Sequence, residues 1–336
     1  MKSVLLFSLF SVLLVFALPL LLSVPGTGAE PVESVQPTAP PADAAAVEAS
    51  PTPVLDSAIS LRLWTEDGVR TMSMAEYLPL ALAGEMPAAF HPEALKAQAV
   101  ALRSYALYYR DAPKSAHPEA DVCENAGCCA ARTTLAALRE TWGGRFDEYY
   151  AKVCAAVSET DGQYLVWEDT PALTVFHASS AGQTESGAAL GMPQAYLCSV
   201  DTPETEETVR NLASTVEVSA EEFRRAILSL APEAELSGPP ETWLGPVSAD
   251  TAGRVEAMEI GGRRLSGLAL RQLFSLRSTD FSLERRESEF VFHVRGYGHG
   301  LGMSQYGADL LADAGANYGE ILEHYYPGTR LVMALR

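Results

Sequence analysis

Apolar side chains recur at helical spacing in the first third of the chain. From Pro92 onward, Leu95, Leu102, Ala106 and Tyr109 follow one another at steps of three, four or seven residues, which places them on one face of a helix. Proline is tolerated at the first helical position, because its missing N–H would have no partner there. The pattern therefore predicts an amphipathic helix that begins at Pro92.

A shorter helix is predicted just before it. Ser73 and Glu76 form a capping box, in which each side chain bonds to the backbone N–H of the other residue. The helix would cover residues 74–83 and end at Gly84, since glycine readily adopts the left-handed conformation. Glu85 would then lie on a short connection between two rigid helices. A carboxylate in such a place can serve catalysis or simply face solvent.

The second half of the chain mixes strands with helices. The elements predicted there include two hairpins, a strand and four helices, over residues 163–177, 219–230, 253–265, 290–294, 305–314 and 318–326 and in a helix that carries Leu270, Phe274 and Leu276. A C-terminal strand is predicted after Gly328. The first hairpin pairs residues 163–167 with residues 172–177, and Ser219 with Glu222 makes a second capping box. Because strands and helices do not alternate regularly, we expect an α+β fold rather than a parallel α/β sheet. We expect one large mixed domain, with a cleft between a helical part near Glu85 and the β-rich parts.

The N-terminal segment is strongly apolar. Its single early charge is Lys2, and the uncharged run that follows is long enough to cross a hydrocarbon core of roughly 30 Å. We expect a transmembrane anchor over residues 1–24, with the rest of the chain outside the cytoplasm because the cation precedes the run. A signal peptide cleaved near residues 27–29 is the alternative. Residues 25–55, rich in proline and alanine, form the expected tether, and residues 56–336 form the expected folded domain.

The charge balance narrows the range of partners. The chain has 43 acidic and 24 basic residues, for a formal net charge of −19. Nucleic-acid binding relies on lysine and arginine contacts to phosphates, so this composition argues against it. Acidity gives no further indication of function, since it also favours solubility.

A group of cysteines suggests a metal site. The chain has five cysteines, at positions 123, 128, 129, 154 and 198. The first three follow His117 closely, and imidazole with thiolate suits zinc, with a fourth position open when the protein supplies three ligands. A loop without metal is the alternative, because no CxxC pair is present. Cys128 fits either a fourth ligand or a disulfide partner, and the sequence does not decide whether Cys154 and Cys198 pair.

Two later segments carry polar groups suited to sugars. Residues 177–185 are rich in hydroxyl and amide side chains, which can pair with sugar hydroxyls. They contain no GxSxG elbow, which argues against a serine hydrolase. Residues 296–307 contain five glycines together with His299, Gln305 and Tyr306, but lack the Gly-Lys-Ser/Thr ending of a phosphate loop. His299 fits either a ligand contact or a structural hydrogen bond.

Two of these segments resemble a known family. Residues 84–107, GEMPAAFHPEALKAQAVALRSYAL, and residues 296–308, GYGHGLGMSQYGA, resemble the two motifs of the stage II sporulation protein D family, which includes amidase enhancers. The resemblance extends from about residue 61 to the C-terminus. It implies a lytic transglycosylase that cleaves peptidoglycan glycan strands during sporulation and engulfment, with Glu85 as the catalytic residue. The substrate's own 6-hydroxyl then attacks the anomeric carbon, so one carboxyl group can serve as acid and afterwards as base.

The same resemblance implies a set of ligands and contacts. His117, Cys123 and Cys129 match the His-x5-Cys-x5-Cys arrangement of zinc-binding members, in which we expect zinc to be structural. The chain departs from the family at Cys128, where a histidine is usual, and at Ala181, where a glycine is usual. Substrate contacts are expected from Arg103, Tyr105, Ser179, Ser180, Gln183, Thr184, Glu185, His299, Gln305 and Tyr306.

Two other functions stay open from the sequence. The domain can bind peptidoglycan and activate an amidase without cleaving glycan itself. Alternatively, a metal on His117, Cys123 and Cys129 that carried a water would make a zinc hydrolase of the stem peptides. In each case the expected partners are peptidoglycan and an amidase or endopeptidase of the engulfment complex, on the outer face of the membrane.

Overall fold

The computed structural model describes residues 52–287 and 289–334, and residues from Pro51 onward form one compact unit. The predicted anchor and nearly all of the tether lie outside the described residues. Within the described part, none of the helices combines the length and the apolar character that crossing a bilayer requires.

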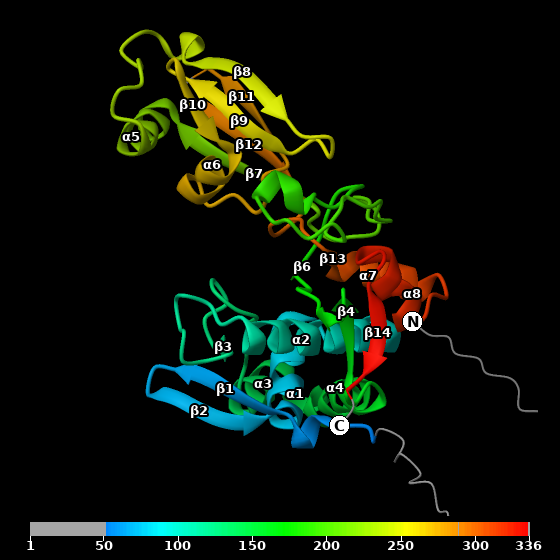
Figure 1. Cartoon of the computed structure of the whole chain (residues 1–336). Helices are drawn as coiled ribbons and strands as arrows, with labels where there is room; N and C mark the ends of the chain where they lie inside the picture. Colours follow the sequence, from blue (N-terminus) through cyan, green and yellow to red (C-terminus); the bar gives the residue numbers. More distant parts are fainter. Residues whose placement is uncertain (1–51, 288, 335–336) are drawn as a thin grey trace, which may run out of the picture. The chain divides into compact units, whose positions relative to one another are not determined.

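Helices and strands occur throughout this unit (Figure 1). The helices are α1 Met74–Glu85, α2 Pro92–Asp111, α3 Leu135–Trp142, α4 Phe146–Glu159, α5 Ala220–Leu230, α6 Gly267–Leu273, α7 Gln305–Asp313 and α8 Tyr318–Tyr325. The strands are β1 Ser60–Thr65, β2 Gly68–Ser73, β3 Val122–Cys123, β4 Gln163–Trp167, β5 Thr170–Pro171, β6 Phe176–His177, β7 Ala213–Ser219, β8 Leu244–Ala249, β9 Val255–Ile260, β10 Arg263–Ser266, β11 Phe281–Arg286, β12 Glu289–Arg295, β13 Met303–Ser304 and β14 Arg330–Met333. This mixture confirms the predicted α+β class.

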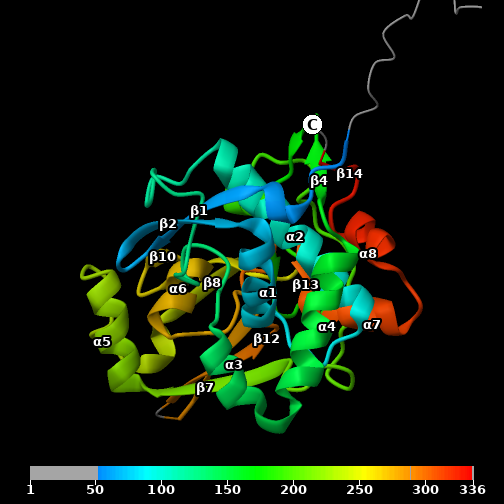
Figure 2. The ribbon, with the colours of Figure 1, turned by 90° about the horizontal axis from the view of Figure 1, so that it is seen from below.

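The first hydrophobic core is built around α2. Helices α1, α4, α7 and α8 and strand β4 all pack against it, and Figure 2 shows α1 close to α2 and α4. Residues 94–107 of α2 are almost all buried. At its centre, the guanidinium of Arg103 is fully buried and makes two bonds of 2.7 Å to the carboxylate of Asp56. This core joins the start of the described chain to its end, because the N–H of Val54 donates to the Ala334 carbonyl at 2.7 Å and β14, just before it, pairs antiparallel with β4.

The second hydrophobic core lies within residues 213–295. Two three-stranded sheets, ordered β10-β9-β8 and β11-β12-β7, enclose aromatic and aliphatic side chains together with α5 and α6. Phe223 of α5 stacks on Phe290 of β12 with ring centres 4.0 Å apart. The predicted capping box of Ser219 and Glu222 opens α5, and Gly261 and Gly262 form the predicted hairpin turn between β9 and β10.

The first predicted hairpin is wrong in its second strand. Strand β4 forms as predicted, but its partners are β5 and β14. Only Phe176 and His177 of the expected second strand are extended in a sheet, and they pair in parallel with Met303 and Ser304. Pairing between residues more than 120 positions apart leaves no local pattern in the sequence. This parallel pairing of β6 with β13 places His177 beside the glycine-rich segment, residues 296–307.

Candidate functional site

A cleft of about 530 Å³ opens beside the C-terminal end of α1. Its side chains come from α1, α2, the cysteine loop, β6 and the glycine-rich segment, and they include Glu85, Tyr105, Lys114, His177, His299 and Gln305. Among the described residues that line it, Glu85 carries the only carboxylate. The cleft thus brings together Glu85, Tyr105, His299 and Gln305, four of the residues that the sequence selected.

Glu85 is half-buried and held from two directions. The backbone N–H of Ala131 donates a hydrogen bond to its Oε1, and the side-chain amide of Gln305 also bonds to the carboxylate. Burial raises the pKa of Glu85 above its usual value, and these two donors partly offset that rise. A carboxyl group in this environment holds a proton more readily than an exposed glutamate does.

Gly84 has a different role from the predicted one. Helix α1 continues through Gly84 and ends at Glu85, so Glu85 is the last helical residue rather than part of the connection. A Cβ on Gly84 would lie only 3.0 Å from the carbonyl oxygen of Ala131. Glycine is therefore needed for the close approach of residues 131–133, whose Thr133 N–H donates to the Leu80 carbonyl at 3.2 Å. That approach brings the Ala131 N–H to Glu85.

Gln305 links Glu85 to a second, deeper amide. Its Nε2 lies 3.4 Å from Oε1 of Gln98, and Gln98 is fully buried in α2. Nε2 of Gln98 has no hydrogen-bond partner among the described residues. Because the Gln98 oxygen can only accept, this contact turns the NH₂ group of Gln305 toward Glu85.

The two histidines of the cleft are neutral near pH 7. Burial lowers the pKa of His177 well below its usual value, and burial with the nearby Arg271 lowers that of His299 to about 4. Nδ1 of His177 lies 3.0 Å from the Leu301 carbonyl, which can only accept, so Nδ1 carries the proton. Nε2 then accepts from the hydroxyl of Ser180 at 2.6 Å. Both rings are hydrogen-bonding groups in the cleft rather than proton donors.

Most polar side chains of residues 177–185 turn away from the cleft. Ser179, Ser180, Thr184 and Glu185 are buried. Gln183 is exposed and donates to Asp201 at 2.9 Å. None of these five side chains is among the described residues that line the cleft. In this structure these five predicted sugar contacts thus lie outside the cleft lining, and only the first residues of the loop, His177 and Ala178, reach the cleft; that they contact sugar stays a prediction.

A buried arginine joins this loop to the second core. Arg254 is 2% exposed and donates from Nη2 to the Ser180 hydroxyl at 3.1 Å, with its Nε 3.9 Å from Glu185. Burial, together with the neighbouring Asp250, raises the pKa of Glu185 to about 7. A Cβ on Gly300, whose φ is +84°, would lie 2.6 Å from the Arg254 guanidinium carbon. The glycine-rich segment thus makes room for a structural cation.

Two other predicted substrate contacts pack against neighbouring residues of the protein. Arg103 lies in the first core against Asp56, and Tyr306 packs edge-on against Phe90 with ring centres 4.9 Å apart. Neither is among the described residues that line the cleft. Their types suit sugar binding, but the helical register turns both side chains into the protein, which the motif alone does not reveal.

Two residues of the cleft, Lys114 and Tyr297, were missed from the sequence. Lys114 lies 4.5 Å from the ring centre of Tyr109, and its amino group is 2.8 Å from the Tyr105 hydroxyl. Tyr297 is 54% exposed and lines the same cleft. Its position in the glycine-rich segment was a usable signal, because an aromatic ring between two glycines has few neighbours to cover it. Lys114 follows α2 in an irregular stretch and had no such signal.

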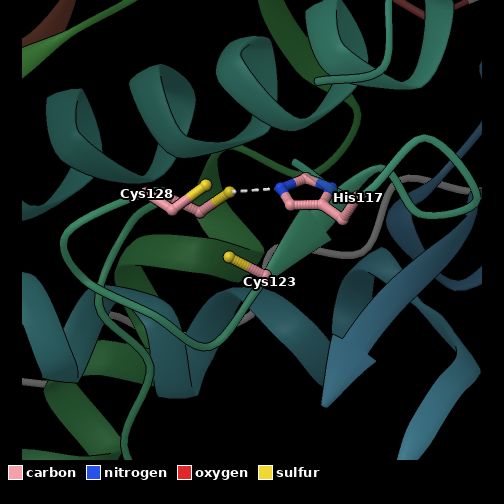
Figure 3. A group of neighbouring side chains, drawn as sticks. His117, Cys123 and Cys128 are labelled. Atoms are coloured by element: carbon pink, nitrogen blue, oxygen red, sulfur yellow. Dashed lines mark hydrogen bonds between the residues drawn. The ribbon is translucent and has the colours of Figure 1, made fainter. Parts of the chain in front are cut away.

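A metal-binding group lies next to the cleft. The ligand atoms of His117, Cys123, Cys128 and Cys129 are all within 4.8 Å of one another, and Figure 3 shows His117, Cys123 and Cys128 pointing toward a common centre. Nε2 of His117 is 3.3 Å from the Cys129 sulfur. Its Nδ1 is 3.2 Å from the Ala120 carbonyl, a contact that fixes the proton on Nδ1 and leaves Nε2 free for a metal. The cluster can hold a metal ion.

The cysteines form no disulfide in the described part of the chain, where all five are free. Cys154 and Cys198 therefore do not pair in this structure. Cys128 lies with the metal group and also lines the cleft. In this structure Cys128 therefore lies beside the other three possible metal ligands and in no disulfide.

Comparison with known proteins gives consistent matches. The SpoIID family model, described as stage II sporulation protein, matches residues 65–167. Stage II sporulation protein D of Bacillus amyloliquefaciens is 31% identical over 287 residues, covering 83% of this chain and 80% of that protein. The protein of the same name from Bacillus subtilis (strain 168) is 31% identical, covering 78% of this chain and 75% of its own length. An amidase enhancer of B. subtilis is 49% identical over 55 residues, 16% of this chain and 8% of that protein.

Proposed function

This chain belongs to the stage II sporulation protein D family, and from that premise we propose that it is a lytic transglycosylase of peptidoglycan glycan strands with Glu85 as its catalytic residue. The observation that carries the proposal is a single half-buried carboxyl group in the cleft, with a raised pKa and two hydrogen-bond donors. Ordinary glycosidases use two carboxylates on either side of the scissile bond. A cleft with one suits a reaction in which the substrate supplies the nucleophile.

The proposed reaction starts and ends with Glu85 protonated. Glu85 gives its proton to the glycosidic oxygen as the bond from that oxygen to the anomeric carbon breaks. The resulting carboxylate takes the proton of the 6-hydroxyl of the same sugar, and the 6-oxygen bonds to the anomeric carbon. The products are a 1,6-anhydro end and a new free hydroxyl on the leaving sugar, with no water consumed.

The neighbours of Glu85 suit both halves of this cycle. Burial favours the protonated acid before bond cleavage, and the Ala131 N–H and the Gln305 amide stabilise the carboxylate that follows. Neutral His299, with Tyr105 and Lys114, offers donors and acceptors for sugar hydroxyls. The exposed ring of Tyr297 offers a face on which a sugar can pack.

We propose that the metal is zinc, held by His117, Cys123 and Cys129 as the family arrangement implies. Thiolate and imidazole are its preferred protein ligands, and the spacing of the four donor atoms fits such a group. When bound, zinc would supply structural cross-linking of the loop that leads to Ala131. The chemistry on the glycan is assigned to Glu85.

A second candidate function rests on the amidase enhancer match. In that reading the cleft binds glycan and the protein activates a separate amidase without cutting the strand. For both functions we propose an anchor at residues 1–24, a site of action on the outer side of the membrane during engulfment, and an amidase or endopeptidase as partner.

The deciding experiment is product analysis. Purified full-length protein is incubated with peptidoglycan sacculi, and the soluble products are identified by mass spectrometry. Glycan fragments with 1,6-anhydro ends would support the transglycosylase. Freed amino groups without anhydro ends would indicate a peptide hydrolase. Binding to sacculi without either product, together with faster cleavage by an added amidase, would favour the activator.

A further inference from the structure

We infer that Cys128 is a fourth ligand of the metal, so that the site is a closed group of three thiolates and one imidazole. The inference rests on the proposed zinc site and adds a residue at which the chain departs from the family arrangement. The number of protein ligands matters, because a structural zinc has four of them, whereas a catalytic zinc keeps one position for water.

The distances fit a tetrahedral ion. Zinc binds sulfur at about 2.3 Å and imidazole nitrogen at about 2.0 Å, which places the ligand atoms of a tetrahedron roughly 3.5–3.8 Å apart. Here all four atoms lie within 4.8 Å of one another, and Nε2 of His117 is already 3.3 Å from the Cys129 sulfur. A shift of about one ångström in the side chains brings the set to these bonding distances.

The backbone explains how two successive cysteines can face one ion. In an extended chain, neighbouring side chains point in opposite directions. Here the carbonyl of Asn125 accepts from the N–H of both Cys128, at 2.9 Å, and Cys129, at 2.8 Å. This tight turn places the two side chains about 100° apart, as in a helix, so both sulfurs can reach the point that Cys123 and His117 face (Figure 3).

Contacts from α2 and the residues after it hold Cys128 in this position. The Lys114 amino group donates to the Cys128 carbonyl, and the Tyr105 hydroxyl approaches the same oxygen at 3.5 Å. Lys114 is itself placed against the ring of Tyr109. The location of Cys128 is therefore set by residues outside the cysteine loop, and does not depend on the loop alone.

The consequence bears directly on function. With four protein ligands the ion has no position for an activated water, which removes the zinc hydrolase alternative. Because Cys128 also lines the cleft, one ligand of the closed site forms part of the cleft wall.

The test uses the full-length protein with cobalt in place of zinc. Tetrahedral Co²⁺ gives a thiolate-to-metal charge-transfer band whose intensity rises with the number of thiolates. We expect Cys128→Ser to lose about one third of that intensity, the share of one thiolate among three. Cys154→Ser, which removes a partly buried thiol elsewhere, should leave the spectrum unchanged. Identical spectra for Cys128→Ser and the unmodified protein would overturn the inference.

A second measurement needs no variant. X-ray absorption at the zinc edge of the purified protein should show three sulfur neighbours and one nitrogen. Two sulfurs with two lighter neighbours, or no bound zinc while all thiols are reduced, would also overturn the inference. Neither readout depends on glycan cleavage, so the ligand set and the proposed activity can fail independently.

Discussion

The backbone N–H of Ala131 donates a hydrogen bond to Oε1 of Glu85. Ala131 follows the proposed metal ligand Cys129 by two residues, so the loop that would hold the metal also holds the proposed catalytic acid. A change in the order of the metal loop should therefore change how firmly Glu85 is held. This coupling does not require any metal ligand to contact the substrate.

Removal of the proposed zinc should slow glycan cleavage. A chelator would release residues 123–131 from their cross-link, and the Ala131 N–H would no longer be held against Glu85. We expect a fall of about tenfold, the lower range for losses around a metal site, with new protease cuts between residues 117 and 131. Zinc should restore both. A chelated protein with full activity and an uncut loop would contradict this coupling.

Glu85→Gln should abolish cleavage while preserving the fold. The amide keeps the size of the side chain but cannot deliver or retrieve a proton, and such a loss commonly costs about 10²–10⁴ in rate. The rate of anhydro-end formation measures it, and thermal unfolding checks the fold. Glu140→Gln, an exposed change on α3, is the matched control. Activity within tenfold of the unmodified protein would remove Glu85 from the mechanism.

Gln98→Leu should reduce activity without reducing stability. Gln98 orients the Gln305 amide toward Glu85, so we expect a fall in cleavage of about tenfold, corresponding to roughly 1.4 kcal/mol in the barrier. Its buried Nε2 is unpaired, and burying an unpaired polar group costs about 1–3 kcal/mol. An apolar side chain of similar size should leave stability equal or higher. Gln272→Leu, an exposed change, serves as the control. A marked drop in the melting temperature of Gln98→Leu, but not of Gln272→Leu, would contradict the predicted effect on stability.

Gly84→Ala should also lower activity, despite favouring the helix. Alanine exceeds glycine in helix propensity by about 1 kcal/mol, but its Cβ would lie 3.0 Å from the Ala131 carbonyl and push residues 131–133 away from Glu85. Gly144→Ala, where a Cβ meets nothing within 4 Å, is the control. Equal cleavage rates for both variants would show that the close approach is not needed.

The stability of the protein should fall as pH rises from about 4.5 to 7 because of Glu185. Its folded-state pKa is raised to about 7, so in this window the folded state binds more protons than the unfolded state. Each such group lowers the free energy of unfolding by up to about 1.4 kcal/mol per pH unit. Glu185→Gln should flatten this slope in denaturant titrations, whereas exposed Glu221→Gln should not. An unchanged slope would refute the role of Glu185.

Local signals in the sequence predicted much of the framework. The capping boxes at Ser73 and Ser219 identified the starts of α1 and α5, because a cap is a contact between residues three positions apart. The turn at Gly261 identified the β9–β10 hairpin for the same reason. Features that depend on neighbours far away in the chain were not predicted. The parallel pairing of β6 with β13 is the clearest case.

The candidate site shows the same difference between what the local sequence predicts and what distant packing partners decide. The motif identified Glu85 and Gln305 through the family resemblance, and the structure brings them into contact. The side-chain types of Arg103 and Tyr306 suggested sugar binding equally well, but their orientations were set by Asp56 and Phe90, which the motif does not report. Residue type indicates chemistry, whereas the packing partner decides whether that chemistry faces the cleft.

The first core joins both ends of the described chain, and this has a consequence for synthesis. The N–H of Val54 donates to the Ala334 carbonyl at 2.7 Å, and β14 completes the sheet that β4 begins. A ribosome delivers a protein from its N-terminus, so α1 and α2 must wait for residues 330–334 before their core can close. The second core, contiguous over residues 213–295, is free to fold earlier. We therefore expect the proposed wall-cutting site to mature only after residues 330–334 have been synthesised, which would keep a shorter nascent chain from acting on the wall.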